Sequence, residues 1–175
     1  MRLVDPGPME FVGADDHSLY FTGQRGEHLR VSVLDQSLIR VQHYPDGAPR
    51  LDRTWMVVGA DGDTPLEGRH RDDLSPFPHP SFEWTRETDA LHLSTAELHL
   101  QIVTREFGIR WSDAEHRHFA ADLRAAGYLH DLVGQMVVHT MQRRENEHYY
   151  GFGEKAGAGQ SGSANAHEQR RCVRL

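Results

Sequence analysis

A glycine-rich segment near the end of the chain has residue types that could cradle a phosphate or shape a binding site. It reads Gly151-Phe152-Gly153-Glu154-Lys155-Ala156-Gly157. A dinucleotide-binding loop needs Gly-x-Gly-x-x-Gly at the start of a helix within a βαβ unit. Here the third glycine comes one position late, no helical run follows, and no Gly-Lys-Ser/Thr motif is present. We therefore interpret the segment as a sharp structural turn, in which glycine lets the backbone approach a neighbouring domain closely, with nucleotide binding as the alternative.

Three pairs of acidic residues have the type required for cleaving a glycosidic bond. They are Asp15-Asp16, Asp72-Asp73 and Glu145-x-Glu147. The two carboxyl groups of a glycosidase must flank one sugar bond at a separation of about 5–10 Å, which neighbours in turns seldom achieve. Ser37, Ser75 and Cys172 also lack the sequence context of an activated nucleophile. We interpret the acids as solvated turn residues and assign no catalytic residue to this chain.

The 13 histidines of the chain suggest a metal site. His116 and His118 are two residues apart, which places both on one face of a strand, and a cupin-like metal enzyme would use such a pair. Other histidines fall where the apolar residues of the same run point the other way, and these are His28, His43, His92 and His99. We predict that such histidines face solvent, and we predict no metal ligand and no cofactor, with the cupin-like enzyme as the less favoured alternative.

The segments that must position these residues read mainly as β-strands. Residues 28–34 alternate, with Leu29, Val31 and Val33 on one face, and residues 38–44 follow after a short polar link. Two such runs predict a hairpin. We expect further strands at residues 18–22 (the first strand), 55–58, 91–95, 96–104, 107–111 and 135–141.

Two other stretches lack a clear strand pattern. Residues 59–80 contain four prolines and several adjacent charges, which oppose ladder pairing and predict an exposed loop or a partly ordered insertion. Residues 120–132 have moderate helix propensity but are interrupted by Gly127, so a short helix and a loop are both compatible with them.

Length and composition limit the classes of function. A chain of 175 residues suits one domain, whereas a (β/α)8 barrel needs roughly 250 residues. The formal net charge of −7 argues against a nucleic-acid or anionic-membrane partner. Cys172 is the only cysteine, so an internal disulfide and a thiolate zinc cage are excluded. Because the sequence shows no signal peptide and no apolar run of about 20 residues, we expect a cytoplasmic protein.

The last strand pattern and the glycine-rich segment together resemble a known family. The runs that carry the resemblance are Val138-His139-Thr140, then Glu147-His148-Tyr149-Tyr150, then Gly151-Phe152-Gly153-Glu154-Lys155. They are similar to the segment by which family 31 glycoside hydrolases (α-glucosidases and α-xylosidases) pass from an N-terminal β-sandwich into a catalytic barrel. The resemblance extends from about Phe11 to Gly157. It implies an all-β fold: an antiparallel, galactose mutarotase-like β-sandwich over residues 1–157, truncated before the barrel.

The resemblance also implies a function and a site. It implies a non-catalytic domain that packs beside the barrel of an enzyme hydrolysing α-glycosidic bonds, with no activity of its own. The residues expected next to the sugar subsite or at the barrel interface are Tyr149, Tyr150, Gly151, Phe152, Gly153, Glu154 and Lys155. The barrel is then the expected partner, α-glucosides are expected to bind weakly if at all, and the bare interface is expected to self-associate.

A stand-alone carbohydrate-binding or interaction module is the alternative function. Aromatic residues that could stack on a sugar are Trp55, Trp84, Trp111, Tyr149 and Tyr150. We favour core or interface packing for each of them.

Residues 158–175 depart from the family pattern. The family continues after its Glu-Lys-x-Gly with a basic turn and an Asn-x-Asp segment, whereas this tail is small, polar and aperiodic. We predict that the tail is disordered. Codons for Ala164 to Cys172 can be chosen so that the next reading frame encodes an Asn-x-Asp segment, so we hypothesise a frame change or a mispredicted exon after Gly157.

Overall fold

The computed structural model describes residues 2–49, 51–55, 57–58, 62, 64–132, 136–144 and 173–174. Within these residues every strand pair is antiparallel and no helix is present. In chain order the strands are β1 (Leu3–Val4), β2 (Met9–Ala14), β3 (Ser18–Gly23), β4 (His28–Asp35), β5 (Leu38–Tyr44), β6 (Arg53–Thr54), β7 (Arg69–His70), β8 (Glu83–Arg86), β9 (Ala90–Ser94), β10 (Leu98–Val103), β11 (Gly108–Asp113), β12 (His118–Ala121), β13 (Tyr128–Asp131), β14 (Val137–His139) and β15 (Val173–Arg174). None of the described residues forms a helix long and apolar enough to cross a membrane.

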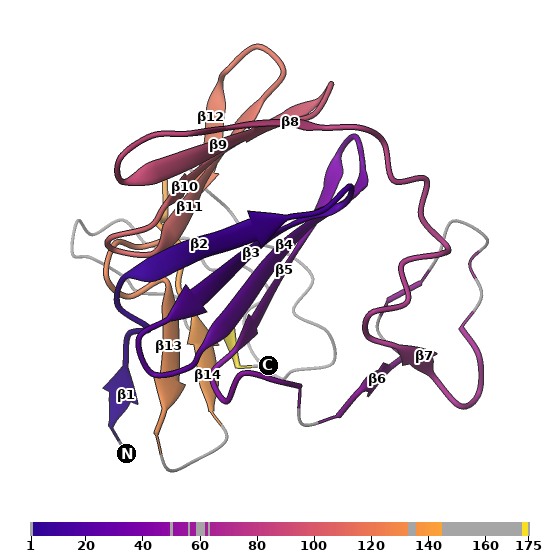
Figure 1. Ribbon diagram of the computed structural model, residues 1–175, viewed down its shortest axis with the longest axis horizontal. Coiled ribbons are helices and arrows are strands. Elements are labelled where there is room, and N and C mark those ends of the chain that lie inside the picture. The colour runs from indigo at the N-terminus through magenta and orange to yellow at the C-terminus, as the bar shows by residue number, and fades with distance from the viewer. Residues whose placement is uncertain are drawn as a thin grey trace, which may run out of the picture.

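Two large sheets lie against each other. One has the order β2-β3-β4-β5 and the other the order β12-β11-β10-β9-β8, and Figure 1 shows the first in indigo and purple with the second above and behind it. Their facing side chains form one core, whose largest fully buried apolar members are Phe21, Phe107, Leu19, Leu29, Leu91, Leu93, Leu100, Ile102, Ile109, Val31 and Val33. The fold is therefore the expected all-β sandwich, built as two hairpin-connected meanders.

The hairpin predicted at residues 28–44 is confirmed. β4 pairs with β5 from His28↔Tyr44 to Asp35↔Leu38, and the apolar side chains that alternate along β4 are all buried. Since a one-residue slip would turn this apolar set toward solvent, burial of one face fixes the register.

Short polar turns connect the strands of each sheet. Asp15 closes the turn between β2 and β3, because its Oδ1 accepts hydrogen bonds from the backbone N–H groups of His17 (2.8 Å) and Ser18 (2.7 Å). Asp113 acts in the same way after β11, where its Oδ1 accepts from the backbone N–H groups of Glu115 (3.1 Å) and Arg117 (2.8 Å). A side-chain carboxylate at such a position replaces a backbone partner and shapes the turn.

A third sheet and a small arm complete the structure. The third sheet has the order β1-β13-β14-β15 and the arm consists of β6 and β7. Figure 1 shows the arm standing to one side of the sandwich, next to β5, while β13 and β14 lie below the second large sheet. The third sheet brings the start of the chain next to β13, and β14 is the strand from which the predicted site segment continues.

Several sequence predictions are wrong in detail. Residues 120–132 contain no helix, because they form the end of β12, a turn and β13. The expected strand at residues 55–58 is not formed at Trp55, Val57 or Val58, since pairing in this region stops at Thr54. The predicted loop at residues 59–80 includes β7, which pairs with β6. Residues 18–22 are part of β3 and not the first strand, because β1 and β2 precede them.

Most of the predicted C-terminal tail lies outside the described residues. Two of its residues, Val173 and Arg174, form β15 and pair with His139 and Val138 of β14. The prediction for the tail as a whole stays a prediction.

Candidate functional site

The predicted site segment begins just beyond β14. All of its residues lie outside the described part of the chain: Tyr149, Tyr150, Gly151, Phe152, Gly153, Glu154 and Lys155. The acids Glu145 and Glu147 also lie outside it. The structure describes the chain that leads to them: Thr140 is buried, Met141 forms a bridge with Asp122, and the Gln142 N–H donates to the Ala121 carbonyl (2.8 Å). The structure therefore describes only the segment that leads into the predicted site, Thr140 to Gln142, which we call its root.

A buried carboxylate holds this root. Asp122 has a side chain that is 1% exposed; its Oδ2 accepts from the Ile109 N–H (2.8 Å) and its Oδ1 from His139 Nε2 (2.8 Å). The Tyr128 phenol contacts the same carboxylate, and burial, followed by the charge of Asp122 and the hydrogen bond to it, raises the pKa of Tyr128 well above its usual value. One side chain thus ties β11, β13 and β14 together.

The packing between Asp122 and Gly127 is tight. A Cβ atom at Gly127 would lie 3.0 Å from the Asp122 Cβ and 3.2 Å from the Leu123 carbonyl oxygen. In the sequence only Gly127 points to this cluster, and there it reads as an interruption of a helical stretch. No sequence pattern predicts the pairing of Asp122 with His139.

The three tryptophans do not gather into one site. Trp84 on β8 packs on Phe11, with ring centroids 5.0 Å apart, and Trp111 on β11 packs against the core. Trp55 follows β6 and donates from Nε1 to the Leu66 carbonyl (2.9 Å), leaving half of the residue exposed. They lie on three different elements, so a shared sugar-stacking platform of tryptophans is not formed.

The histidine pair considered for a metal site does not share a strand face, because β12 begins only at His118 and His116 precedes it. His116 lies in a turn with a φ of 60° and stacks on His99 at 4.1 Å, whereas His118 Nδ1 lies 3.0 Å from the Trp111 carbonyl oxygen. Among the residues that the structure describes, no group of three or more His, Cys, Asp or Glu side chains could hold a metal ion.

His43 does not face solvent as predicted. In β5 it shares the inward face with Ile39 and Val41, opposite Leu29 of β4. Its ring lies 5.8 Å from that of His130 and 5.9 Å from that of Tyr128. Burial, with a smaller contribution from His130, lowers the pKa of His43 to about 4. The side chain is therefore a neutral member of the sandwich interior.

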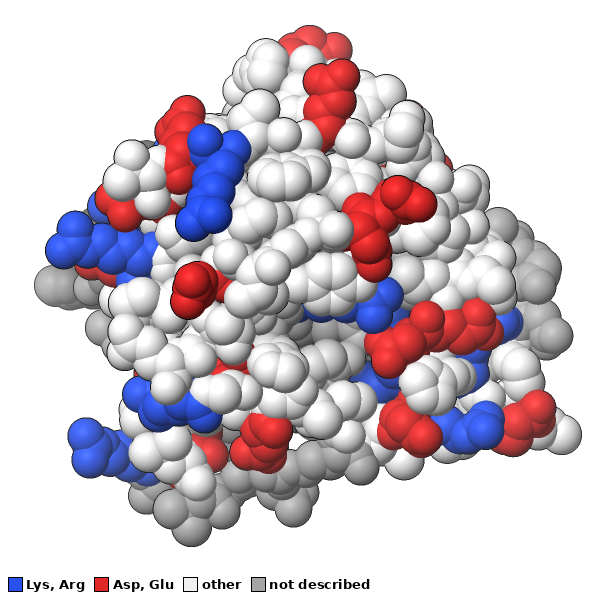
Figure 2. Space-filling model, viewed as in Figure 1, with Lys and Arg blue, Asp and Glu red and all other residues white. Residues whose placement is uncertain are grey.

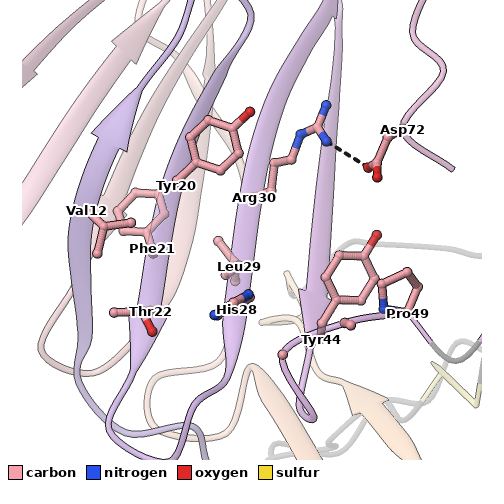
Figure 3. Close-up of a pocket in the computed structure, with 12 residues that line it drawn as sticks. Val12, Tyr20, Phe21, Thr22, His28, Leu29, Arg30, Tyr44, Pro49 and Asp72 are labelled. Atoms are coloured by element: carbon pink, nitrogen blue, oxygen red, sulfur yellow. Dashed lines mark hydrogen bonds and ion pairs between the residues drawn. The ribbon is translucent and has the colours of Figure 1, made fainter.

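A groove lies on the outer face of the β2–β5 sheet. It has a volume of about 400 Å³, within the roughly 300–1,000 Å³ of small-molecule sites. Figure 3 shows Tyr20 and Tyr44 on opposite sides of it, with Arg30 and Asp72 at one end. Figure 2 shows this side of the molecule hollowed near its centre, with acidic and basic side chains together toward the arm.

The acidic pair next to this groove is engaged by arginines. Asp72 Oδ1 accepts from Arg30 (2.8 Å), and Asp73 pairs with Arg69 at 3.4 Å. Ser75 lowers the pKa of Asp73 through hydrogen bonds from its hydroxyl and its N–H. Each carboxylate thus has a separate cationic partner, so the pair has the arrangement of a structural contact and not of two acids around one sugar bond.

Comparison with known proteins gives a consistent result. Residues 28–160 match the family described as the glycosyl hydrolase 31 N-terminal galactose mutarotase-like domain. Among solved structures, a dextranase of this family from Flavobacterium johnsoniae superposes with a TM-score of 0.69 at 13% identity over 89% of this chain. An α-xylosidase from Xanthomonas citri superposes with a TM-score of 0.55 at 21% identity over 82%, and the α-1,4-glucan lyase of Gracilariopsis lemaneiformis with 0.63 at 16% over 87%. No curated protein sequence matches the chain.

The chain is short relative to these structures. It spans 17% of the dextranase chain, 15% of the α-xylosidase chain and 17% of the glucan lyase chain. The similarity therefore concerns one domain of much longer polypeptides.

Proposed function

This chain belongs to the glycosyl hydrolase 31 N-terminal galactose mutarotase-like domains, and from that premise we propose that it serves as the non-catalytic part of an α-glycosidase. In this role the sandwich packs beside a catalytic barrel and supports the sugar subsite without supplying an acid or a nucleophile. The reaction of the whole enzyme is the hydrolysis of α-glycosidic bonds in carbohydrate metabolism.

One observation carries this proposal: nearly all of this chain superposes on less than a fifth of each similar enzyme. A region that recurs at such a fraction of a larger hydrolase fits a supporting domain. The acids of the described residues agree with this, because Asp72 and Asp73 are held in separate ion pairs and Asp122 is buried within a structural network.

The geometry of β14 supports an interface role for the segment that follows it. The Asp122 network anchors β14 to β11 and β13, so the chain leaves the sandwich from a fixed strand. In our proposal Tyr149, Tyr150 and Phe152 contact the barrel, and the Gly151 to Lys155 turn borders the sugar subsite. Rigid anchoring next to a binding segment reduces the entropy lost when that segment is ordered.

Three measurements test the catalytic part of the proposal. The purified chain should not turn over chromogenic α-glucosides or α-xylosides, because Asp72, Asp73 and Asp122, among the acids that the structure describes, are held in separate structural contacts. Turnover that survives purification to homogeneity would contradict the proposal. The DNA downstream of the codon for Gly157 should encode a (β/α)8 barrel in one of its frames. A fusion of this domain to that barrel should hydrolyse α-glycosides, with the barrel alone as the control.

A solution measurement tests the interface part. With the barrel missing, Tyr149, Tyr150 and Phe152 should leave an apolar patch that promotes self-association. Sedimentation velocity and binding of an apolar dye should show oligomers, and a Tyr149→Ser, Tyr150→Ser double variant should reduce both signals. Phe119→Ser, which removes a 42% exposed aromatic from β12, is the matched control. A monodisperse monomer that binds no dye would contradict this part. The cytoplasmic location expected from the sequence stays a prediction.

A further inference from the structure

The groove on the outer face of the β2–β5 sheet is built from aligned rows of outward-facing side chains. In the register of the sheet, Tyr20 lies opposite Arg30 and Arg30 opposite Gln42. The next row contains Thr22, His28 and Tyr44. Because side chains alternate between the two faces of a sheet, both rows project away from the core and toward the same space. Loop residue Asp72 covers one end (Figure 3).

The charges at the groove are balanced. Arg30 donates from Nε to the hydroxyls of Ser18 (3.2 Å) and Ser32 (3.0 Å) and from one terminal nitrogen to Asp72 (2.8 Å). The Arg30 side chain is 17% exposed and that of Asp72 is 54% exposed. A compensated ion pair selects neither a cation nor an anion strongly, since an ionic ligand would have to compete with the existing partner.

The same pair still offers hydrogen-bonding positions. A guanidinium has five N–H donors, and a carboxylate accepts at about four positions. The three contacts of Arg30 use only part of its donors, and Asp72 Oδ1 is the single oxygen engaged by Arg30. A hydroxyl group, which both donates and accepts, fits between an open donor and an open acceptor.

The aromatic walls are held in place by their own hydroxyls. The Tyr20 hydroxyl donates to Asp15 Oδ2 (2.6 Å), and the guanidinium of Arg30 lies 5.8 Å from the centroid of the Tyr20 ring. The Tyr44 hydroxyl accepts from Gln42 Nε2. Fixed rings lose little side-chain entropy when a ligand packs against them, which favours binding.

A buried polar atom lies beneath this surface. Gln42 is 7% exposed, and its Oε1 has no hydrogen-bond partner in the described structure. A buried acceptor without a partner costs free energy, but Gln42 is not among the residues that line the groove, so we assign it no contact with a ligand.

From these features we propose that the groove is a binding site for a short neutral oligosaccharide of hexopyranose units, separate from the catalytic subsite. The rings of Tyr20 and Tyr44 contact the apolar C–H faces of the sugar, and Arg30 and Asp72 bind adjacent hydroxyls at one end. The exposed His28 and the hydroxyl of Thr22 lie on the floor between the tyrosines. All the residues that line the site belong to this chain, and the proposal goes beyond the role proposed above.

The test is an NMR titration of the ¹⁵N-labelled chain with maltotriose and with isomaltotriose. We expect saturable shifts of the amides of Tyr20, Thr22, His28 and Tyr44, with a Kd of about 1–10 mM, as befits a small open site. Tyr44→Ala and Asp72→Asn should each weaken binding about tenfold, equivalent to about 1.4 kcal/mol. Tyr44→Phe, which keeps the ring, should retain most of the affinity.

Two variants serve as matched controls. Asp73→Asn changes the neighbouring acid, which pairs with Arg69 outside the groove, and Phe119→Ala removes an exposed aromatic from the other large sheet. Both should bind as the unchanged chain does. The proposal is overturned by the absence of saturable shifts, by shifts confined to other surfaces, by equal loss in the controls, or by tighter binding of glucuronate or glucosamine than of the neutral sugars. A null result here would leave the catalytic and interface tests unaffected, because they measure turnover and self-association.

Discussion

Removal of the Asp122 carboxylate should be among the most damaging single changes outside the apolar core. Asp122→Ala leaves the buried Ile109 N–H and the buried Tyr128 hydroxyl without their acceptor. Each such group costs about 1–3 kcal/mol, whereas His139, whose side chain is 29% exposed, can regain a water partner cheaply. The expected loss in the free energy of unfolding is therefore about 2–5 kcal/mol, a large part of the total stability of a domain.

Urea denaturation followed by tryptophan fluorescence measures this loss. The double variant Asp122→Ala, Tyr128→Phe should be less destabilised than the sum of the two single variants, because Tyr128→Phe removes one of the orphaned donors in advance. Asp113→Ala is the matched control: it removes a carboxylate at the end of β11 that has equally short hydrogen bonds but is 30% exposed, so the change should be clearly smaller. A loss below about 1 kcal/mol for Asp122→Ala, or strict additivity of the pair, would refute the assignment of Asp122 as the anchor of β14.

Three further perturbations have defined outcomes. Burial lowers the pKa of His43 from 6.5 to about 4, so between these pH values the unfolded chain binds a proton at His43 and the folded chain does not. The free energy of unfolding should therefore be highest above pH 6.5 and fall by up to about 3 kcal/mol as the pH drops toward 4. His43→Phe should remove most of this pH dependence, measured by urea denaturation at a series of pH values. Gly68→Ala should destabilise by about 1–3 kcal/mol, since the residue has a φ of +74° and its Cβ would lie 2.7 Å from Trp55; unchanged stability and Trp55 emission would contradict this. Ile102→Ala should cost about 2–5 kcal/mol in the same melts, and a cost near zero would show that Ile102 is not in the core.

Alternation of apolar residues predicted the central strands well. Leu29, Val31 and Val33 repeat every second residue, and burial of that face between two sheets leaves only one register. The edge strands show weaker alternation of apolar and polar residues. β8 reads Glu-Trp-Thr-Arg and is exposed along its whole length, so its pairing with β9 is set by the partner strand and not by a pattern of its own.

Polar residues of the interior were harder to predict. His43 shares a face with Ile39 and Val41, and the alternation in β5 was therefore sufficient to place it inside; the prediction failed because histidine was assumed to follow the polar face. Asp122 lies in a stretch with no periodicity, and its partners come from Ile109 and His139, far away in the sequence. Such contacts depend on tertiary pairing, which local patterns do not contain. The groove is missed for the same reason, since β3, β4, β5 and a distant loop residue must meet to form it.

Several side chains hold the β6–β7 arm by donating to main-chain oxygens, one of them from β5 and two within the arm itself. Arg40 donates to the Arg71 carbonyl (2.7 Å), Arg71 to the Leu51 carbonyl (2.6 Å) and Trp55 to the Leu66 carbonyl (2.9 Å). Every residue type supplies a backbone carbonyl, so a substitution at an accepting position leaves the hydrogen bond in place, whereas a substitution at a donor removes it. The β6–β7 arm can therefore vary in sequence among homologues and still keep its position. We expect natural variation at Leu51 and Leu66 to exceed that at Arg40 and Trp55.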